Sequence, residues 1–489
     1  MNTVISPEIK SRERRTDGIM KTIPGERFTP FTVAKKLGAS VLLESSSFKK
    51  GKERYSILLV REAFRVFEKA GHTYLSTEEK EYLIRKKEGD ILDVLAYFAR
   101  QHSPLHQDLP FPAGGIGFLG YEYAARFDTI RLRKRSQGSP MSPMNPKDPA
   151  DLPEAAFIFG HLFLIFDHYT DLIYLIGLNY REHEIDLQSA LRETELRLND
   201  LDFNYLAEPA EPYHANLQKV PGEKENFLRG VERVKEEIMK GNLLQGVLSR
   251  RLRIRTNIPA IEAYKSLRSS NPSPYLFYLD FRNFQLFGSS PEVQVKVKEG
   301  KAEMHPIAGT RRRGSGQEED NLLARELRND EKEKAEHLML VDLARNDLGR
   351  VCRQGSVEVN SFKEVEYYSH VMHLVSRVTG ALEEGKSGLD AIRATFPAGT
   401  VSGAPKIRAI ETIDSLEREA RGFYAGLVGY LEPDGGIDTC ITIRSALKLK
   451  NTLFLQAGAG IVYDSIPERE FEETNEKLRA LAGAVGLEV

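Results

Sequence analysis

The second half of the chain contains strand-like segments joined by very short connections. Residues 276–281, 284–287 and 292–297 are apolar or alternating runs, and only Arg282 and Asn283 separate the first two. Antiparallel strands can be joined by a two-residue turn, whereas parallel strands need a crossover of a dozen or more residues. These segments therefore predict a meandering antiparallel sheet.

Strand-like and helical patterns occur in blocks along the whole chain. Runs of strands and runs of helices, rather than strict alternation, predict an α+β fold in which large antiparallel β-sheets pack together and are covered by helices on the outside. The remaining segments behind this prediction are strands at 39–45, 54–60, 425–430, 439–447 and 452–457, and helices at 28–37, 321–349 and from Pro467 onward.

Changes in composition divide the chain into four parts. Residues 1–21 carry charge and almost no apolar periodicity, which predicts a flexible N-terminal arm. Residues 207–225 contain three prolines and a cluster of charges, a composition typical of linkers. We therefore expect an N-terminal domain at 22–206 and a second domain at 226–489.

The overall composition argues against several functional classes. A chain of 489 residues with 41% hydrophobic residues can bury a sizeable core, and its formal net charge of −2 gives no footprint for nucleic acid or an anionic membrane. The longest apolar run, 161–178, is interrupted by Asp167, His168 and Asp171 and is too polar to span a bilayer. The first residues lack the apolar core of a signal peptide, and two cysteines cannot build a disulfide framework. A cytoplasmic protein without nucleic-acid or membrane partners is expected.

The most distinctive string is a loop rich in glycine and hydroxyl groups that leads into a helical run ending near Ile413. Lys406 and Arg408 add positive charge to the start of that helix, which suits a small anion, although a turn capped only for stability is the alternative. The string, residues 396–413, closely resembles the signature of chorismate-utilising enzymes, in the form found in the large (synthase) subunits, component I, of anthranilate synthases. The resemblance extends over residues 23–481 and implies a regulatory N-terminal domain and a chorismate-binding catalytic domain.

Two predicted helices each carry a pair of carboxylates on one face. Glu333 and Glu336 lie three residues apart, and Glu470 and Glu473 repeat that spacing on a helix whose start a capping box from Ser465 is expected to fix. Solvated surface carboxylates are the alternative. Inward-facing carboxylates on two helices predict a Mg²⁺ site, because Mg²⁺ prefers few protein carboxylates together with water and an anionic substrate.

The resemblance assigns a role to each of these four carboxylates. It implies that Glu336 and Glu473 ligate Mg²⁺, and that Glu333 and Glu470 hold the water ligands of the metal. It further implies that Glu333 is the general acid and that the metal binds the ring carboxylate of chorismate.

The second carboxylate of chorismate, on the enolpyruvyl group, needs a separate cation. The resemblance implies Arg444 together with Tyr424, and a planar guanidinium can hold a carboxylate through two hydrogen bonds. A surface arginine is the alternative. The full set of substrate-binding residues expected from the resemblance is Ala308, Gly309, Thr310, Tyr424, Arg444, Gly458, Ala459, Gly460 and Lys477.

A histidine and a threonine complete the expected catalytic set. His370 and His373 lie three apart in a strand-like run, so they should point to opposite faces and share no metal. A lone buried histidine is often structural. The resemblance implies that His373 assists the elimination that forms the aromatic ring, and that Thr400 forms a hydrogen bond near the ring hydroxyl.

Two positions distinguish among the reactions of this family. Relatives that make 4-amino-4-deoxychorismate commonly carry a lysine nucleophile where this chain has Ala308, and relatives that use water carry a lysine where it has Gln245. The resemblance therefore implies that ammonia attacks chorismate to give anthranilate and pyruvate, the first committed step of tryptophan biosynthesis. An aminodeoxychorismate synthase component I and a non-catalytic subunit that senses tryptophan or chorismate are the alternatives.

The source of ammonia is expected to be another chain. Neither Cys352 nor Cys440 lies in a glycine-rich, nucleophile-like setting, so we expect no glutamine hydrolysis by this chain. The resemblance implies a class I glutamine amidotransferase subunit as the partner.

Two short segments, one from each half of the chain, resemble the tryptophan-contacting segments of the family. We expect feedback inhibition by L-tryptophan, with Glu44 receiving the ammonium group, Ser45 forming a hydrogen bond, and Pro274 and Tyr275 enclosing the indole. A plain strand and a plain turn are the alternatives. The expected tryptophan-binding residues are Leu43, Glu44, Ser45, Pro272, Pro274, Tyr275 and Leu276.

Overall fold

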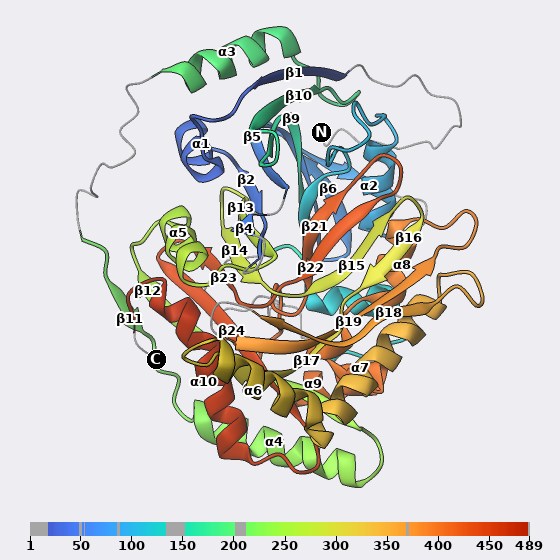
Figure 1. Cartoon of the computed structure of the whole chain (residues 1–489). Helices are drawn as coiled ribbons and strands as arrows, with labels where there is room; N and C mark the ends of the chain where they lie inside the picture. The colour runs from blue at the N-terminus through green and yellow to red at the C-terminus, as the bar shows by residue number, and fades with distance from the viewer. Residues whose placement is uncertain are drawn as a thin grey trace.

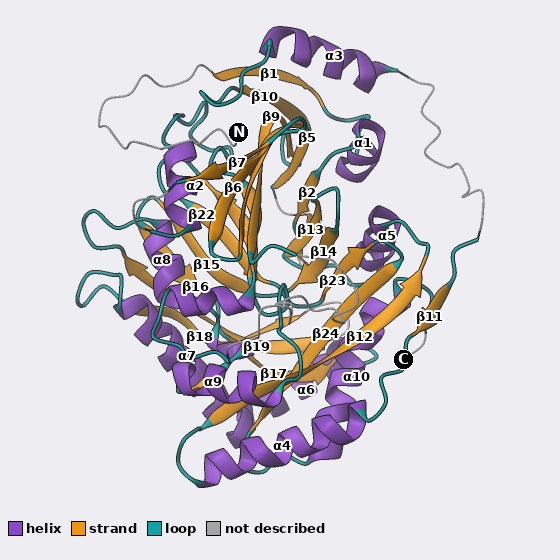
Figure 2. Ribbon diagram, turned by 180° about the vertical axis from the view of Figure 1, so that it is seen from behind, coloured by secondary structure: helices purple, strands orange, loops and turns teal. Residues whose placement is uncertain are grey.

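The computed structural model describes residues 18–47, 51–52, 54–85, 89–133, 152–200, 212–367 and 371–487. Within those ranges, 22 strands form one hydrogen-bonded network in which the paired strands are antiparallel. Helices surround this network, as Figures 1 and 2 show from opposite sides. The predicted α+β class is confirmed.

Two long central strands, β5 (Tyr55–Lys69) and β9 (Ala155–Asp167), connect two branches of the network. The first branch continues from β5 through β2 (Val41–Glu44), β13 (Tyr275–Asp280), β14 (Gln285–Ser290), β23 (Ser445–Leu449), β24 (Thr452–Ile461) and β12 (Gln245–Thr256). The second continues from β9 through β8 (Ile116–Leu119), β21 (Leu427–Leu431), β22 (Ile437–Ile441), β15 (Val293–Lys298), β16 (Lys301–Met304) and β19 (Val371–Ala381), which pairs with β17 (Ile307–Arg312) and β18 (Glu358–Tyr367).

Shorter strands complete the described chain. β1 (Gly18–Pro24) and β10 (Leu172–Leu178) extend the sheet beside β9, and β6 (His72–Ser76) and β7 (Glu81–Ile84) extend it beside β5. β11 (Ala215–Leu217) and β20 (Gly403–Ala404) pair with β12, and β3 (Ser46–Ser47) pairs with β4 (Gly51–Lys52).

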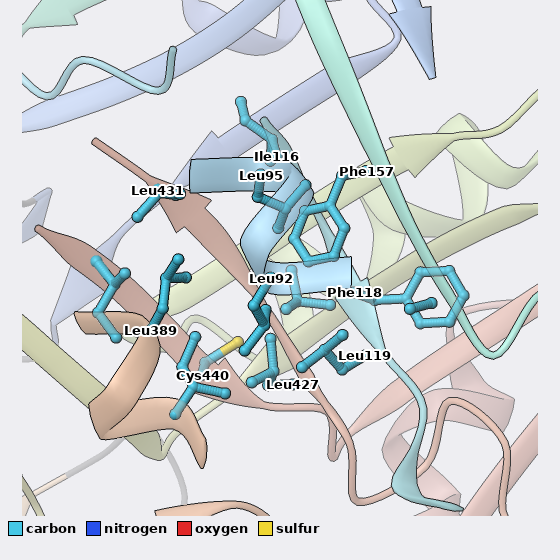
Figure 3. Packing of buried hydrophobic residues seen from close by; sticks show 14 of the residues in the cluster. Leu92, Leu95, Ile116, Phe118, Leu119, Phe157, Leu389, Leu427, Leu431 and Cys440 are labelled. Carbon is cyan, nitrogen blue, oxygen red and sulfur yellow. The ribbon is translucent and has the colours of Figure 1, made fainter. Parts of the chain in front are cut away.

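Apolar side chains from both branches pack against each other in one large core cluster. Phe277 of the first branch and Phe118 and Leu427 of the second belong to it. Figure 3 shows the part of this core where Leu92 and Leu95 lie over strands β8 and β21. A second cluster fills the space between the first branch and helices on its outer side. The sheets therefore pack together beneath an outer layer of helices.

The helices follow the apolar spacing seen in the sequence. The helix predicted at 28–37 begins at Pro30, with Thr29 as its N-cap, and the region predicted at 321–349 contains two helices. The described helices are α1 (Pro30–Leu37), α2 (Ile91–Ala99), α3 (Leu187–Asn199), α4 (Glu223–Met239), α5 (Ala260–Ser270), α6 (Gln317–Asn329), α7 (Glu331–Gly349), α8 (Gly388–Thr395), α9 (Lys406–Leu416), α10 (Pro467–Gly483) and the 3₁₀ turns η1 (Tyr121–Arg126) and η2 (Gly399–Val401).

Hydrogen bonds between strands cross the boundary drawn between the two expected domains. β2 pairs with β13, and β8 pairs with β21. β1 begins at Gly18, within the expected arm, and β11 and the start of α4 lie within the expected linker. Residues 1–17 and 201–211 lie outside the described chain, and the ability of either part to fold alone stays a prediction.

Two local predictions are wrong. Helix α10 has Ile466 as its N-cap without a side-chain cap, because the Ser465 hydroxyl accepts the Val462 N–H at 3.0 Å instead of capping the helix. The strand predicted at 439–447 is two strands, β22 and β23, with Arg444 between them at φ +49°. A side chain in this left-handed region is uncommon and often marks a functional site.

None of the helices in the described part of the chain is both long and apolar enough to cross a membrane.

Candidate active site

The N-terminal half of α7 presents two carboxylates to the ends of neighbouring strands. The Asp330 side chain caps this helix by accepting the N–H groups of Lys332 and Glu333. The Glu333 carboxylate accepts a hydrogen bond from Arg311 Nη1 of β17 at 2.9 Å. Glu336, one turn later, accepts one from Gln245 Nε2 of β12 at 3.0 Å. The predicted helical face is therefore directed into the protein, toward β12 and β17.

Helix α10 brings a second pair of carboxylates near the first. Burial raises the pKa of Glu336, and the charges of Glu333 and Glu473 raise it further. Burial also raises the pKa of Glu470, where Glu473 again adds to the effect. All four predicted carboxylates thus belong to one electrostatic cluster.

This cluster suits a cation that takes few protein ligands. No three His, Cys, Asp or Glu side chains in the described ranges converge closely enough to enclose a metal on their own. Lys477 Nζ lies 2.7 Å from Glu473 Oε1 and donates to Gly458 O at 2.8 Å. Carboxylate oxygens with one neighbouring ammonium group fit Mg²⁺, which completes its coordination with water and substrate oxygens.

The Arg444 guanidinium lies within range of the charge of Glu473. Within the described residues, the Arg444 side chain forms no hydrogen bond and no ion pair. Burial lowers the pKa of Arg444, and the charges of Tyr424 and Glu473 offset part of that effect. Burial raises the pKa of the Tyr424 phenol to about 12, while Arg421 and Arg444 act in the other direction. A half-buried guanidinium of this kind is suited to a carboxylate brought by a ligand.

The glycines of β24 allow close contact around these groups. A Cβ atom added at Gly458 would lie 2.9 Å from Leu248 O, and one added at Gly460 would lie 2.7 Å from Gln245 Nε2. Ala459, between them, is fully buried and pairs with Leu248 of β12. A Cβ atom at Gly458 would press on the β12 backbone, and one at Gly460 would push the Gln245 side chain aside.

His373 lies on β19 beside the β17 backbone. Its Nδ1 is 2.9 Å from Gly309 O, so the N–H on Nδ1 donates to that carbonyl and Nε2 carries no proton. Burial lowers the pKa of His373 to about 4, and Arg444 and Lys477 lower it further, so the ring is neutral at pH 7. Ala308 is buried, and the β17 register shifts between Ala308 and Thr310, whose backbone pairs with His373. His370 lies outside the described residues.

Thr400 reaches the site through a loop that packs tightly on α7. A Cβ atom at Gly399 would lie 1.8 Å from Leu343 Cδ2, so only glycine permits this approach. The Thr400 hydroxyl is buried without a well-formed hydrogen bond. Lys406, which the sequence suggested for a small anion, instead binds Asp347 Oδ2 at 2.7 Å and Thr395 O at 2.8 Å.

Glu292 is a member of this site that the sequence did not reveal. It is only 7% exposed and lies beside Thr400 and Lys477. The pKa of Glu292 is raised to about 8, because the effect of burial outweighs the opposing effects of its two neighbours. Glu292 and Gln294 of the alternating run at 292–297 are both buried, so alternation alone carried no signal for this residue.

A family model described as "chorismate binding enzyme" matches residues 49–483. The chain belongs to the chorismate-binding enzyme family. A Spirochaeta aurantia protein named anthranilate synthase component 1 is 57% identical over 478 residues, covering 98% of this chain and 97% of that protein. A Bacillus pumilus protein of the same name is 37% identical and covers 98% and 93%. The family membership expected from the sequence is confirmed.

Solved structures of chorismate-binding enzymes share the fold. Anthranilate synthase component I from Streptococcus pneumoniae TIGR4 has a TM-score of 0.76 and 36% identity, covering 88% of this chain and 92% of that one. The menaquinone-specific isochorismate synthase MenF from Escherichia coli has a TM-score of 0.71 at 20% identity, covering 98% and 96%. The second match supports the fold alone.

A cavity with a volume of about 1230 Å³ lies between the two halves of this chorismate-binding enzyme. Leu43, Ser45, Pro274, Tyr275 and Leu276, all expected to contact tryptophan, line it. Val428, Tyr430 and Cys440, which carried no signal in the sequence, line it too.

Glu44 is another of the residues that line this cavity. The Glu44 carboxylate accepts hydrogen bonds from Tyr264 Oη at 2.8 Å and Arg268 Nη2 at 2.9 Å, both from α5. The ammonium group expected at Glu44 stays a prediction. Pro272 lies outside the lining of the cavity.

Proposed function

We propose that this protein is the synthase component of an anthranilate synthase, which converts chorismate and ammonia to anthranilate and pyruvate in tryptophan biosynthesis. The observation that carries the proposal is the Arg444 guanidinium, which has no hydrogen bond or ion pair among the described residues and lies within range of the charge of Glu473 in the carboxylate cluster of α7 and α10. Such a site offers one cation of its own and the ligands for a second. A small substrate with two carboxylates matches that arrangement. The 57% identity to a protein named anthranilate synthase component 1 supports the same choice.

Mg²⁺ is the cation that the carboxylate cluster fits. Glu336 and Glu473 would hold it directly, and Glu333 and Glu470 would hold its water ligands. When bound, Mg²⁺ would supply positive charge to the ring carboxylate of chorismate. It would also relieve the repulsion that raises the pKa values of Glu336 and Glu470.

Arg444 and Tyr424 would hold the enolpyruvyl carboxylate. Positive potential near that group comes from the Lys477 ammonium and from the main-chain N–H groups at Gly458 and Gly460, with Ala459 between them. Ala308, Gly309 and Thr310 would form the wall of the site beside His373.

The proton donor to the departing C4 hydroxyl is assigned to Glu292 in this proposal. Its pKa of about 8 means that the carboxyl is largely protonated at pH 7, and the Thr400 hydroxyl lies beside it. Glu333, the donor implied by the resemblance, is paired with Arg311, and we assign it to the water ligands of the metal.

His373 is assigned to the second half of the reaction. Its unprotonated Nε2 can accept the proton from C2 as pyruvate leaves and the ring becomes aromatic. Because the neutral ring is fixed through Nδ1, the tautomer that accepts a proton at Nε2 is already present.

Ammonia is the proposed nucleophile. Ala308 offers no amine for covalent attack on the ring, and Gln245 offers no base to activate water. Ammonia would come from glutamine through a class I amidotransferase subunit, component II.

The test incubates the purified chain with chorismate, ammonium and Mg²⁺ and follows anthranilate fluorescence. Anthranilate should form with ammonium but not with glutamine alone. Absence of anthranilate with ammonium would refute the proposal, and accumulation of 4-amino-4-deoxychorismate would identify the alternative enzyme. Anthranilate from glutamine and the chain alone would contradict the separate amidotransferase.

L-Tryptophan is the proposed feedback inhibitor, bound in the cavity between the two halves of the chain. Tyr275, Tyr430 and Pro274 offer flat apolar surfaces for an indole, and Ser45 offers a hydroxyl. Because the cavity is built from both halves of the chain, tryptophan can change their packing with a coupling free energy of about 1–3 kcal/mol.

A further inference from the structure

One arginine near the proposed chorismate site is fully buried. Arg421 follows helix α9 and is 1% exposed. Its Nη1 donates to Val401 O at 2.7 Å, and its Nη2 donates to Val247 O at 2.5 Å. Both carbonyls belong to segments that carry residues of the site.

Each contact of this guanidinium fixes a different wall of the site. Val401 directly follows Thr400 in η2. Val247 lies two residues after Gln245 on β12 and pairs with Gly460. The ring of Tyr424 lies 5.6 Å from Arg421 Cζ. One planar group therefore links the loop of Thr400, the strand of Gln245 and the ring of Tyr424.

The guanidinium itself is held rigidly. Glu417 accepts Nε at 3.0 Å through Oε2 and Nη2 at 2.8 Å through Oε1, and its Oε1 also accepts the Ser249 N–H at 2.8 Å. The ring of Tyr121, from the N-terminal half, lies 4.5 Å from Cζ.

The main chain at Arg421 is fixed by the N-terminal half as well. The Arg421 N–H donates to Glu122 Oε1 at 2.7 Å, and the Gly422 N–H donates to Glu122 Oε2 at 3.0 Å. The side chain and backbone of Arg421 thus have few alternative positions.

An ion pair that only stabilised the core would not need this set of acceptors. Taking a guanidinium and a carboxylate out of water is costly, and well-packed apolar residues can often replace such a pair. The Arg421 guanidinium instead donates to two main-chain carbonyls that flank functional residues. We propose that Arg421 is a positioning residue, which fixes Thr400, Gln245 and Tyr424 relative to one another for chorismate binding. This inference rests on the proposed function.

The test compares Arg421→Lys and Arg421→Met with the wild-type full chain, assayed with chorismate, ammonium and Mg²⁺. Lysine keeps the charge but cannot reach the two carbonyls and Glu417 at once. In Arg421→Met, kcat/KM for chorismate should fall by about 10- to 100-fold, chiefly through KM, because displaced walls no longer fit the substrate. Arg421→Lys should lie between that variant and the wild type.

Arg393→Met is the matched control. Arg393 forms ion pairs with Asp90 and Asp93 and joins α8 to α2, so its loss should also lower the unfolding temperature. Its KM for chorismate should stay that of the wild type. An Arg421→Met variant with wild-type KM, or a control whose KM rises equally, would overturn the inference.

A double-mutant cycle with Tyr424→Phe separates positioning from general weakening of the fold. If Arg421 acts through Tyr424, the effect of Tyr424→Phe on KM should largely disappear in the Arg421→Met background. Equal effects in both backgrounds would contradict this.

Hydrogen–deuterium exchange gives a readout that does not depend on turnover. Amides at 399–403 and 245–249 should exchange faster in Arg421→Lys, while those of β5 stay unchanged. Unchanged exchange in both segments would overturn the positioning role. If the wild-type chain forms no anthranilate while Arg421→Lys still exchanges faster in these two segments, only the proposed function is refuted.

Discussion

Replacing Glu292 by glutamine tests the chemistry of the site most directly. The wild-type carboxyl is buried beside Thr400 and Lys477, and its pKa is raised to about 8. With that pKa, the fraction of enzyme that carries the proton is about 0.9 at pH 7, 0.5 at pH 8 and 0.1 at pH 9. If this proton is donated to the departing hydroxyl, wild-type kcat/KM should fall about tenfold between pH 7 and pH 9.

Glu292→Gln keeps the size of the side chain and removes the proton. Its rate at pH 7 should be lower by about 10²–10⁴-fold, and the alkaline fall should disappear. Initial rates of anthranilate formation should be measured at a fixed concentration of free ammonia, since ammonium itself deprotonates in this range. Glu154→Gln is the control, because burial also raises the pKa of Glu154, which is paired with Arg126 far along the chain from the site. It should keep the alkaline fall.

The same pKa shift predicts the pH dependence of stability. The folded chain retains the Glu292 proton up to about pH 8, whereas an ordinary glutamate carboxyl loses it near its usual pKa of 4.5. The folded state therefore binds more protons in this window, and the contribution of Glu292 to the free energy of unfolding falls as pH rises from about 4.5 to 8. Glu292→Gln should lack that component. Wild-type rates in Glu292→Gln, or an unchanged alkaline fall, would refute the assignment of the acid.

Three further predictions concern the metal, the base and the inhibitor. Glu336→Gln or Glu473→Gln should weaken Mg²⁺ binding, measured by titration calorimetry, and lose most activity, because each removes a charged ligand from a site with few such ligands. Unaltered binding in both variants would exclude the metal assignment. His373→Ala should consume chorismate and accumulate an aminated, non-aromatic intermediate detectable by mass spectrometry, and failure to consume chorismate would count against a role confined to the elimination. Ser45→Phe should weaken inhibition by L-tryptophan because the larger ring occupies the cavity; a wild type insensitive to millimolar tryptophan would exclude the regulatory site.

Regular spacing explains what could be predicted of the fold. Short turns such as Arg282–Asn283 fixed antiparallel pairing, and helical spacing placed Glu333 and Glu336 on the inner face of α7. Both depend on residues close in the sequence. The structure agrees because tertiary packing follows the apolar face that those residues define.

Contacts between distant segments explain what could not be predicted. Glu292 directly precedes β15 and is buried beside Thr400, a residue from a distant segment of the chain. Arg268, which pairs with Glu44, lies 224 residues farther along the chain. Arg421 bonds to carbonyls 20 and 174 residues away, and no local pattern specifies such partners.

The pairing of strands from the two halves also governs what would happen if the chain were divided. A cut within 201–211, where the expected linker begins, would leave β2 without β13 and β8 without β21, with four residue pairs lost at each junction. Each fragment would then expose unsatisfied strand edges, which recruit any available strand, including that of another copy. Fragments made separately should therefore aggregate, whereas fragments made in the same cell should reassemble edge to edge. The two pieces of such an enzyme would be held together by backbone hydrogen bonds between strands rather than by a shared side-chain surface.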